Sequence, residues 1–258
     1  MGFHIIACIK PVLTKAPDNG IVRTADTAEM NPFDRVALET ALTIAGERKG
    51  TVTALSMGPG SCAFVLYEAM AMGVHRGVLL NDRRLADSDT LATSTALAGA
   101  ITALAPFDLV VFGTRTADSD TGQVGPQTAV SLNLPLVTGA CSLAVRKKTL
   151  RVERKMDEFR EIYEVALPAV LTIDPSSVRP RDIPLRGIDD AYSERGIEIL
   201  TLDDIPITSA SVGSVGSPTK VLSMKRVSRE RRCEFIEGTT EEQADRVVKL
   251  IGESGLVG

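Results

Sequence analysis

Short apolar segments alternate with longer helical ones through the first 113 residues, and this alternation constrains the fold more than any other feature of the sequence. The predicted strands are residues 4–9, 51–57, 77–81 and 108–113, and the predicted helices are residues 31–50, 61–73 and 88–104. The strands are short apolar runs, whereas the helices are longer and carry start or stop signals. Strands that alternate with helices in this order predict an α/β fold, in which helices cover both faces of a parallel sheet.

The helix at residues 31–50 has a well-marked start. Asn31 is expected to cap it, and Pro32 suits the first helical position. Asp34 places a carboxylate in the first turn, where the helix dipole favours negative charge.

Polar, glycine-rich segments follow two of the predicted strands, at residues 56–61 and 113–126, and residues 7–10 close the first strand. The carboxyl ends of parallel strands lie at one edge of a sheet, where ligands bind at the point at which the strand order reverses. The sequence therefore predicts a ligand site there.

The longest of these segments is GTRTADSDTGQVGPQTA, residues 113–129. Asp120 and Gln123 have the spacing of a capping box, which predicts a helix that begins at Thr121. The amide groups of its first turn could seat a pyrophosphate, with Gly122 and Gly125 allowing close approach. A capped helix that holds no ligand is the alternative.

The helix at residues 88–104 has hydroxyl groups at the start of its inward face, where its later turns are apolar. These residues, Thr90, Thr93 and Ser94, are expected to face a cleft. The alternative is that the hydroxyls bond their own helix backbone.

Composition excludes several function classes. The formal charge of −4 gives no general attraction to nucleic acid or to an anionic membrane, and the basic residues 225–232 are interpreted as solvated or partner-facing. The N-terminus lacks the features of a signal peptide and no stretch is long enough to span a bilayer, so we expect a cytoplasmic protein without membrane insertion. The four scattered cysteines and two histidines argue against a metal site, an iron–sulfur cluster or a disulfide framework.

Catalytic motifs are also missing from the sequence. It contains no G-x-G-x-x-G, Walker A, nucleophile elbow or histidine-centred triad, so no catalytic residues of its own are expected. A phosphotransferase that uses Asp118 or Asp120 is disfavoured, because four residues separate the predicted strand from Asp118.

The pattern changes in the last third of the chain. Residues 143–173 are predicted as strands at the sheet edge, and residues 175–238 show no sustained periodicity. An arm that lies on another chain explains such a tract better than an ordinary loop does, with disorder as the alternative. An amphipathic helix follows at residues 240–254. The predicted organisation is a nucleotide-binding α/β domain at residues 1–174, an extended arm at 175–238 and a C-terminal helix at 239–258 that packs on a partner.

Several segments together resemble one known family. They are ACIKPV (7–12), MNPFDRVALETAL (30–42), SMGP (56–59), AMAMGVHRGVLL (69–80), TADSDTGQVGPQTA (116–129) and LPAVLT (167–172). In this order they resemble the beta subunit of electron transfer flavoproteins, over nearly the whole chain. The resemblance implies a Rossmann-like domain related to adenine nucleotide alpha hydrolases. It also implies a heterodimer with an alpha subunit that carries an electron-shuttling FAD.

The resemblance implies an adenine-nucleotide site in this chain. The implied cofactor-binding residues are Ala7, Lys10, Asn31, Asp34, Met57, Gly58, Gly113, Thr116, Asp118, Asp120, Thr121, Gln123, Val124, Gly125, Pro126 and Gln127. The segment 180–191 aligns with the family's docking arm and places Leu185 where an exposed leucine contacts an acyl-CoA dehydrogenase. A core leucine at this position is the alternative.

Within the family, residues 88–94 and 118–127 resemble the electron-bifurcating members, which bind a second FAD in the beta subunit. Thr90, Thr93 and Ser94 would suit the pyrophosphate of that FAD. The expected partners are then NADH, ferredoxin or flavodoxin, and an acyl-CoA dehydrogenase. The alternatives are a simple electron relay with structural AMP and, in another class, a stand-alone adenine-nucleotide sensor.

Overall fold

The computed structural model describes residues 2–14, 23–193, 195–223 and 233–255. Contacts within the chain form two compact units, residues 1–222 and residues 223–258. Each unit is described by itself. The basic cluster predicted at residues 225–232 falls outside the described residues.

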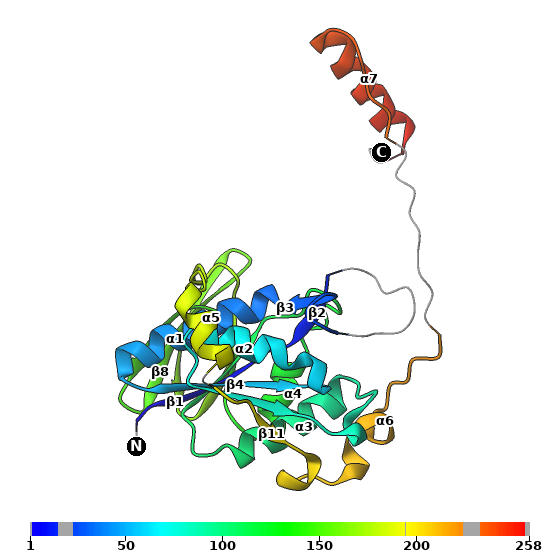
Figure 1. Cartoon of the computed structure of the whole chain (residues 1–258). Helices are drawn as coiled ribbons and strands as arrows, with labels where there is room; N and C mark the ends of the chain where they lie inside the picture. Colours follow the sequence, from blue (N-terminus) through cyan, green and yellow to red (C-terminus); the bar gives the residue numbers. More distant parts are fainter. Residues whose placement is uncertain (1, 15–22, 194, 224–232, 256–258) are drawn as a thin grey trace. The chain divides into compact units, whose positions relative to one another are not determined.

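A mostly parallel sheet forms the centre of the first unit (Figure 1). Its strands are β1 His4–Cys8, β4 Thr51–Met57, β5 Arg76–Leu80, β6 Leu109–Gly113, β7 Leu136–Arg146, β8 Thr149–Met156, β9 Phe159–Ala166, β10 Ala169–Ile173 and β11 Glu198–Leu200. Their order in the sheet is β11-β5-β4-β1-β6-β10-β7-β8-β9. Neighbouring strands from β11 to β7 are parallel, and β7, β8 and β9 pair in antiparallel fashion. A separate antiparallel pair joins β2 Pro11–Leu13 to β3 Ala28–Met30.

Helices cover the sheet on both faces, as predicted. The helices of the first unit are α1 Pro32–Arg48, α2 Phe64–Ala71, α3 Thr90–Ala103, α4 Val124–Ser131, α5 Leu185–Ser193 and α6 Gly213–Gly216, with short 3-10 turns η1 Gly60–Ala63, η2 Arg83–Leu85, η3 Leu202–Asp204 and η4 Ser209–Ser211. One buried cluster joins α1 and α2 to the sheet, and a second joins α3 and α4 to the other face. This is the doubly covered parallel sheet that the alternating sequence pattern predicts.

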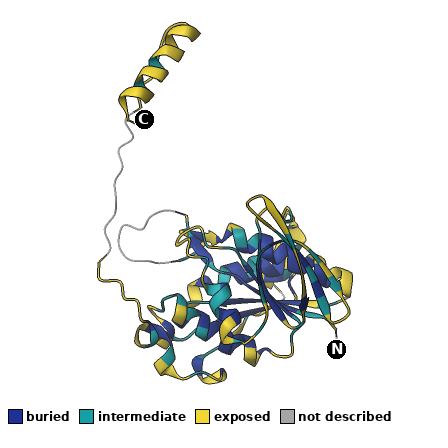
Figure 2. Cartoon of the chain, turned by 180° about the vertical axis from the view of Figure 1, so that it is seen from behind, coloured by how far each residue is buried: buried dark blue, intermediate teal, exposed yellow. Residues whose placement is uncertain are grey.

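Strand β1 explains why such a sheet has continuous apolar strands. Ile5 and Ala7 belong to the cluster under α1 and α2, whereas Ile6 and Cys8 belong to the cluster under α3 and α4. Successive side chains of a strand point to opposite faces, so a doubly covered strand is apolar at most positions, with buried Thr53 and Ser56 of β4 as exceptions. Figure 2 shows the sheet interior as buried.

The strands predicted at residues 143–173 are present as a sheet extension. The β7–β8 and β8–β9 turns contain Lys147 and Asp157, both at positive φ values, 45° and 49°. Beyond the helix layers, the extension exposes apolar side chains such as Phe159 and Ile162. The last strand of this region, β10, does not stay at the edge but inserts between β6 and β7.

Residues 175–222 differ from the predicted arm, because they belong to the first compact unit. Strand β11 pairs in parallel with β5, and Leu202, Ile205 and Val212 are buried in the cluster under α3. Each apolar residue of this tract fills a separate position on the existing surface. Such contacts leave no periodicity in the sequence, so the predicted boundary at residue 174 does not coincide with the boundary of the unit.

The second unit contains α7, Thr240–Glu253, in agreement with the helix predicted at residues 240–254. Its start is a capping box, in which the Thr239 hydroxyl accepts from the Glu242 amide and the Glu242 carboxylate accepts from the Thr239 amide. This is the Thr–x–x–Glu signal of the sequence. None of its side chains is buried within the unit.

Candidate functional site

A pocket of about 510 Å³ opens at the carboxyl ends of the parallel strands, in the size range of small-molecule sites. It lies where the sheet order reverses, because β1 pairs with β4 on one side and with β6 on the other. Its lining comes from the segments after β1 and β6, from the first turns of α3 and α4, and from single residues such as Met57 and Val221. The site is therefore at the edge and the switch point that the sequence indicates.

Asp34 joins the ends of the two strands that flank the switch point. Its Oδ2 accepts from the Lys10 amide at 2.9 Å, and its Oδ1 accepts from the Gly113 amide at 3.2 Å. Gly113 is required here, since a Cβ atom at this position would lie 2.5 Å from Asp34 Oδ1. Burial raises the pKa of Asp34 to about 7, although these amides and the Asn31 side chain favour its ionised form.

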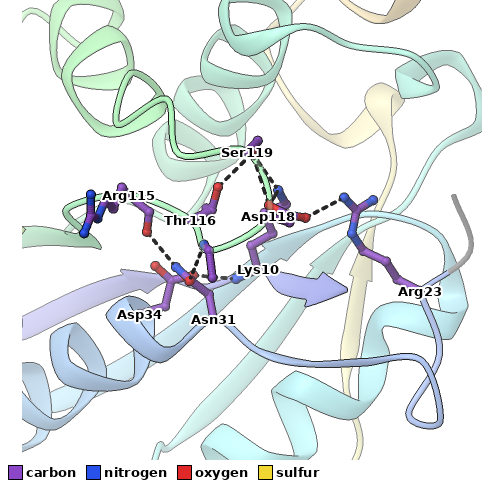
Figure 3. Close-up of polar contacts among 9 residues, drawn as sticks. Lys10, Arg23, Asn31, Asp34, Arg115, Thr116, Asp118 and Ser119 are labelled. Atoms are coloured by element: carbon purple, nitrogen blue, oxygen red, sulfur yellow. Dashed lines mark hydrogen bonds and ion pairs between the residues drawn. The ribbon is translucent and has the colours of Figure 1, made fainter. Parts of the chain in front are cut away.

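Asn31 holds the segment after β6 rather than capping α1. It occupies the N-cap position but makes no side-chain cap hydrogen bond. Its Nδ2 donates to the Arg115 carbonyl at 2.8 Å, and its Oδ1 accepts from the Ala117 amide at 3.2 Å (Figure 3). The predicted side-chain cap is therefore wrong, because this amide finds both partners in another segment.

The predicted capping box at Asp120 and Gln123 is also wrong. Helix α4 begins at Val124, with Gln123 at the N-cap position and no side-chain cap hydrogen bond. Gly122 has a positive φ value, 61°, which a helix beginning at Thr121 could not contain, and the positive φ value of Asp120, 53°, is not that of an N-cap residue. Asp120 instead pairs with Arg115, at 3.3 Å. The first amides of α4 thus have no side-chain cap, and Val124 and Gly125 line the pocket.

Two hydroxyl–amide pairs link α3 to the start of α4. The Thr90 hydroxyl donates to Gln123 Oε1 at 3.0 Å, and one turn further the Ser94 hydroxyl approaches Gln127 Oε1 at 3.4 Å. Ser94 is fully buried and also bonds the Leu91 carbonyl of its own helix, as the alternative reading of these hydroxyls expected. Thr90 lines the pocket, whereas Ser94 does not.

Three polar groups on this side of the pocket make no hydrogen bond to the described residues. They are the hydroxyls of Thr93 and Thr121 and the Nε2 amide of Gln123, and all three residues line the pocket. Thr95 differs from them, since its hydroxyl donates to the Leu91 carbonyl at 2.9 Å. The three groups are donors that a bound ligand can engage.

An ion cluster lies beside the segment after β6. Lys10 Nζ contacts Asp118 Oδ1 at 2.8 Å, and Arg23 contacts Asp118 Oδ2 at 2.8 Å (Figure 3). Burial disfavours the charge on Asp118, but Arg23 and Lys10 outweigh this and hold the pKa of its carboxyl well below the usual range. Lys10 and Arg23 line the pocket. Sequence reasoning missed Arg23, because no motif marks it and its partner is 95 positions away.

Some predicted residues do not line the pocket. Ala7 is fully buried, Gly58 packs against Cys62, and Gln127 reaches Ser94. Pro126 lies in the first turn of α4 and does not line the pocket. Asp118 and Asp120 do not line the pocket either, but they form ion pairs with residues that do. The predicted residues that do line it are Lys10, Asp34, Met57, Thr90, Thr93, Gly113, Thr116, Thr121, Gln123, Val124 and Gly125.

Leu185 begins α5 and is 86% exposed, so it is not a core residue. Tyr192, at the other end of this helix, stacks on Tyr67 of α2 with ring centroids 4.6 Å apart. Ahead of α5, Arg181 binds the Glu39 carboxylate of α1 through two guanidinium nitrogens, at 2.7 and 2.9 Å. Burial opposes the charge on Glu39, but Arg181 lowers the pKa of Glu39 below its usual value. These contacts hold the exposed leucine on a fixed helix.

Two features are absent from the described residues. They contain no cluster of three or more histidine, cysteine, aspartate or glutamate side chains that could hold a metal ion. Among the same residues, no helix combines the length and the apolar character needed to cross a membrane.

Comparison with known proteins gives concordant matches. Residues 18–202 match the electron transfer flavoprotein domain. The chain is 36% identical to the electron transfer flavoprotein subunit beta of Thermoanaerobacterium thermosaccharolyticum. This match extends over 237 residues, which are 92% of this chain and 91% of that protein. The chain is 36% identical to the caffeyl-CoA reductase-Etf complex subunit CarD of Acetobacterium woodii, over 98% of this chain and 100% of that protein. It is 33% identical to the acryloyl-CoA reductase electron transfer subunit gamma of Anaerotignum propionicum, over 98% of this chain and 100% of that protein.

Proposed function

Because this chain belongs to the electron transfer flavoprotein beta subunit family, we propose that it forms a cytoplasmic heterodimer with an alpha subunit and binds FAD in the switch-point pocket. The two start points of α3 and α4 carry the proposal, since both lie at the pocket. Helix N-termini favour negative charge, and the first amides of α4 have no side-chain cap. The start of α4 therefore suits the pyrophosphate of FAD, whereas the start of α3, which Asp89 caps, contributes side-chain hydroxyls.

The free donors at this end of the pocket support the same ligand. Thr93, Thr121 and the Gln123 amide would donate to pyrophosphate oxygens, and Gly125 lets the first turn of α4 pack closely on β6 and β10. A Cβ atom at Gly125 would lie only 3.0 Å from Thr172 and 3.2 Å from Phe112. The cofactor supplies the redox chemistry when bound, and the residues of this chain bind and orient it. No side chain of this chain is assigned a bond-breaking role.

We further propose a role in electron bifurcation, in which the heterodimer passes electrons between NADH, ferredoxin or flavodoxin, and an acyl-CoA dehydrogenase. Two relatives that match nearly the whole chain are named as parts of acyl-CoA-type reductase systems, those for caffeyl-CoA and acryloyl-CoA. The hydroxyls of Thr90 and Thr93 at the pocket agree with a ligand longer than AMP.

The first experiment is to purify the chain with its alpha subunit, release the bound nucleotides by denaturation and quantify FAD and AMP. Two FAD and no AMP per heterodimer is the expected result. One FAD and one AMP would overturn the second FAD and leave the simple relay with structural AMP. The Thr93→Val variant should lose FAD from this site. The matched control is Thr95→Val, because the Thr95 hydroxyl bonds its own helix and does not line the pocket.

Docking of the dehydrogenase is proposed to use Leu185, the exposed first residue of α5. The Leu185→Ala heterodimer should keep its cofactors and its thermal stability while its affinity for the dehydrogenase falls roughly tenfold, as expected for loss of an apolar anchor. Val130→Ala on α4 is the control, since Val130 is 78% exposed and distant in sequence. Equal effects of the two variants would contradict the docking role.

A further inference from the structure

Lys10, Asp118 and Arg23 place more positive than negative charge at the pocket. Two cations share one carboxylate, and each occupies a different carboxylate oxygen. The low pKa of Asp118 keeps this carboxylate ionised, so the cluster carries one excess positive charge. The Asp118 side chain itself is only 10% exposed, and solvent screens the cluster less than it would a surface pair.

The other acidic groups near the pocket make their hydrogen bonds and ion pairs with groups other than the side chains of Lys10 and Arg23. Arg115 pairs with Asp120 across the loop. Asp89 caps α3 through the Ala92 amide and also accepts from the Thr219 amide. Asp34 is held by two backbone amides, and burial raises its pKa to about 7. Among these carboxylates of the described residues, Asp118 is therefore the one that pairs with the side chains of Lys10 and Arg23, although the charge of Lys10 also acts on Asp34.

Arg23 also has a donor without an acceptor. Its Nε atom is buried and has no hydrogen-bond partner among the described residues. A buried donor that lacks a partner costs free energy, and native proteins satisfy most such groups. Lys10 likewise keeps donor capacity, because its ammonium group has three protons and contacts only Asp118 and, at 3.5 Å, Ser119.

We propose that Lys10 and Arg23 form an anion-binding wall of the pocket, which contacts a phosphate oxygen of the bound nucleotide and is held in place by Asp118. This assigns a binding role to Arg23 and a positioning role to Asp118. The proposal rests on the nucleotide site of the preceding section and adds a second, charged point of contact. The α3 and α4 starts supply uncharged donors, whereas this wall supplies net charge.

The test measures binding of adenosine, AMP and ADP to the nucleotide-free full chain in complex with its alpha subunit, by calorimetry. Arg23→Gln should weaken AMP and ADP roughly tenfold and change adenosine less than twofold, because adenosine has no phosphate. Asp118→Asn should weaken AMP and ADP severalfold and change adenosine less than twofold, because the two cations lose the carboxylate that positions them. A purely structural role would instead weaken all three ligands in both variants.

Controls separate this inference from the proposed function. Arg83→Gln removes an exposed arginine that does not line the pocket, and it should change none of the affinities. Lys10→Gln provides a second variant if Arg23→Gln does not fold, with the same expected selectivity for phosphate. If the wild type binds AMP or ADP and both cation variants bind them as tightly as the wild type does, the charged wall is refuted while the proposed nucleotide site stands. If the wild type binds no nucleotide, the proposed nucleotide site fails, and the charged wall fails with it.

Discussion

The pocket has two polar walls of different origin. One wall consists of the α3 and α4 starts, with Thr93, Thr121 and Gln123 as uncharged donors, and the other consists of Lys10 and Arg23 around Asp118. The first wall is built from helix starts whose hydroxyls and glycines are visible in the sequence. The second depends on side chains that meet across 95 and 108 positions. The walls should therefore differ in their response to salt, to pH and to substitution.

The largest effect is expected from a substitution at Gly113, which contacts Asp34 at the ends of β1 and β6. Gly113→Ala would place a Cβ atom 2.5 Å from Asp34 Oδ1 and 2.7 Å from the Phe33 carbonyl carbon. Overpacking of this kind against backbone should lower the free energy of unfolding by roughly 2–4 kcal/mol. Gly46→Ala, in the interior of α1 with no atom within 4 Å of the new Cβ, should raise it by about 0.5–1 kcal/mol. Urea unfolding of both variants measures the difference, and a stable Gly113→Ala protein would contradict the close contact.

The next effect concerns the pH dependence of Asp34. Its folded-state pKa of about 7 lies above the unfolded value of about 3.9, so the folded chain binds a proton that the unfolded chain has released. This group therefore contributes most stability below the unfolded pKa and loses it as pH rises through 7. Between pH 4 and 7 the contribution should fall by a few kcal/mol at most.

Urea unfolding from pH 5 to pH 8 tests this pH dependence. Asp34→Asn should flatten the part of the profile that belongs to this carboxyl. Glu39→Gln is the control, because Arg181 lowers the pKa of Glu39 and this carboxylate stays ionised throughout the range, so its removal should leave the shape of the profile unchanged. An Asp34→Asn profile parallel to that of the wild type would show that Asp34 stays ionised when folded.

A substitution of Gln123 tests the uncharged wall without changing the net charge of the pocket. Gln123→Leu should weaken ADP binding by about 1.5–3 kcal/mol, the usual range for a hydrogen bond to a charged group, with unchanged salt dependence. Arg23→Gln should reduce the salt dependence of the same affinity. Calorimetry at two salt concentrations distinguishes the walls, and equal salt slopes for both variants would refute their division.

The smallest expected effect is that of Thr90. Its hydroxyl orients the Gln123 amide at 3.0 Å, so Thr90→Val should weaken ADP by less than 1 kcal/mol. The effect should vanish in a Gln123→Leu background, because Thr90 would then have no amide to orient. A double-mutant cycle measures this coupling, and additive effects would mean that Thr90 contacts the ligand directly.

The sequence predicts those helices and strands in which buried apolar residues recur at regular spacing. Periodicity identifies β1, β4, β5 and β6, and their glycine-rich ends indicate the pocket. Periodicity cannot reveal residues 175–222, because Leu202 and Val212 each fill one site on an existing surface. The start of α4 was misplaced for a related reason: Gln123 bonds Thr90 of another helix instead of its own N-terminus. Arg23 depends on a distant partner and carries no local signal.

The position of β11 has a consequence for the synthesis of this protein on the ribosome. β11 lies beside β5, although Glu198 follows Arg76 by more than one hundred residues, and the two side chains form an ion pair at the sheet edge. While the nascent chain ends before residue 198, the backbone groups of β5 have no strand partner on that side. An open edge of this kind can pair with the same edge of a neighbouring nascent chain. Ribosomes translating one message in close succession therefore expose this edge together, until the strand near the end of the α/β unit covers it.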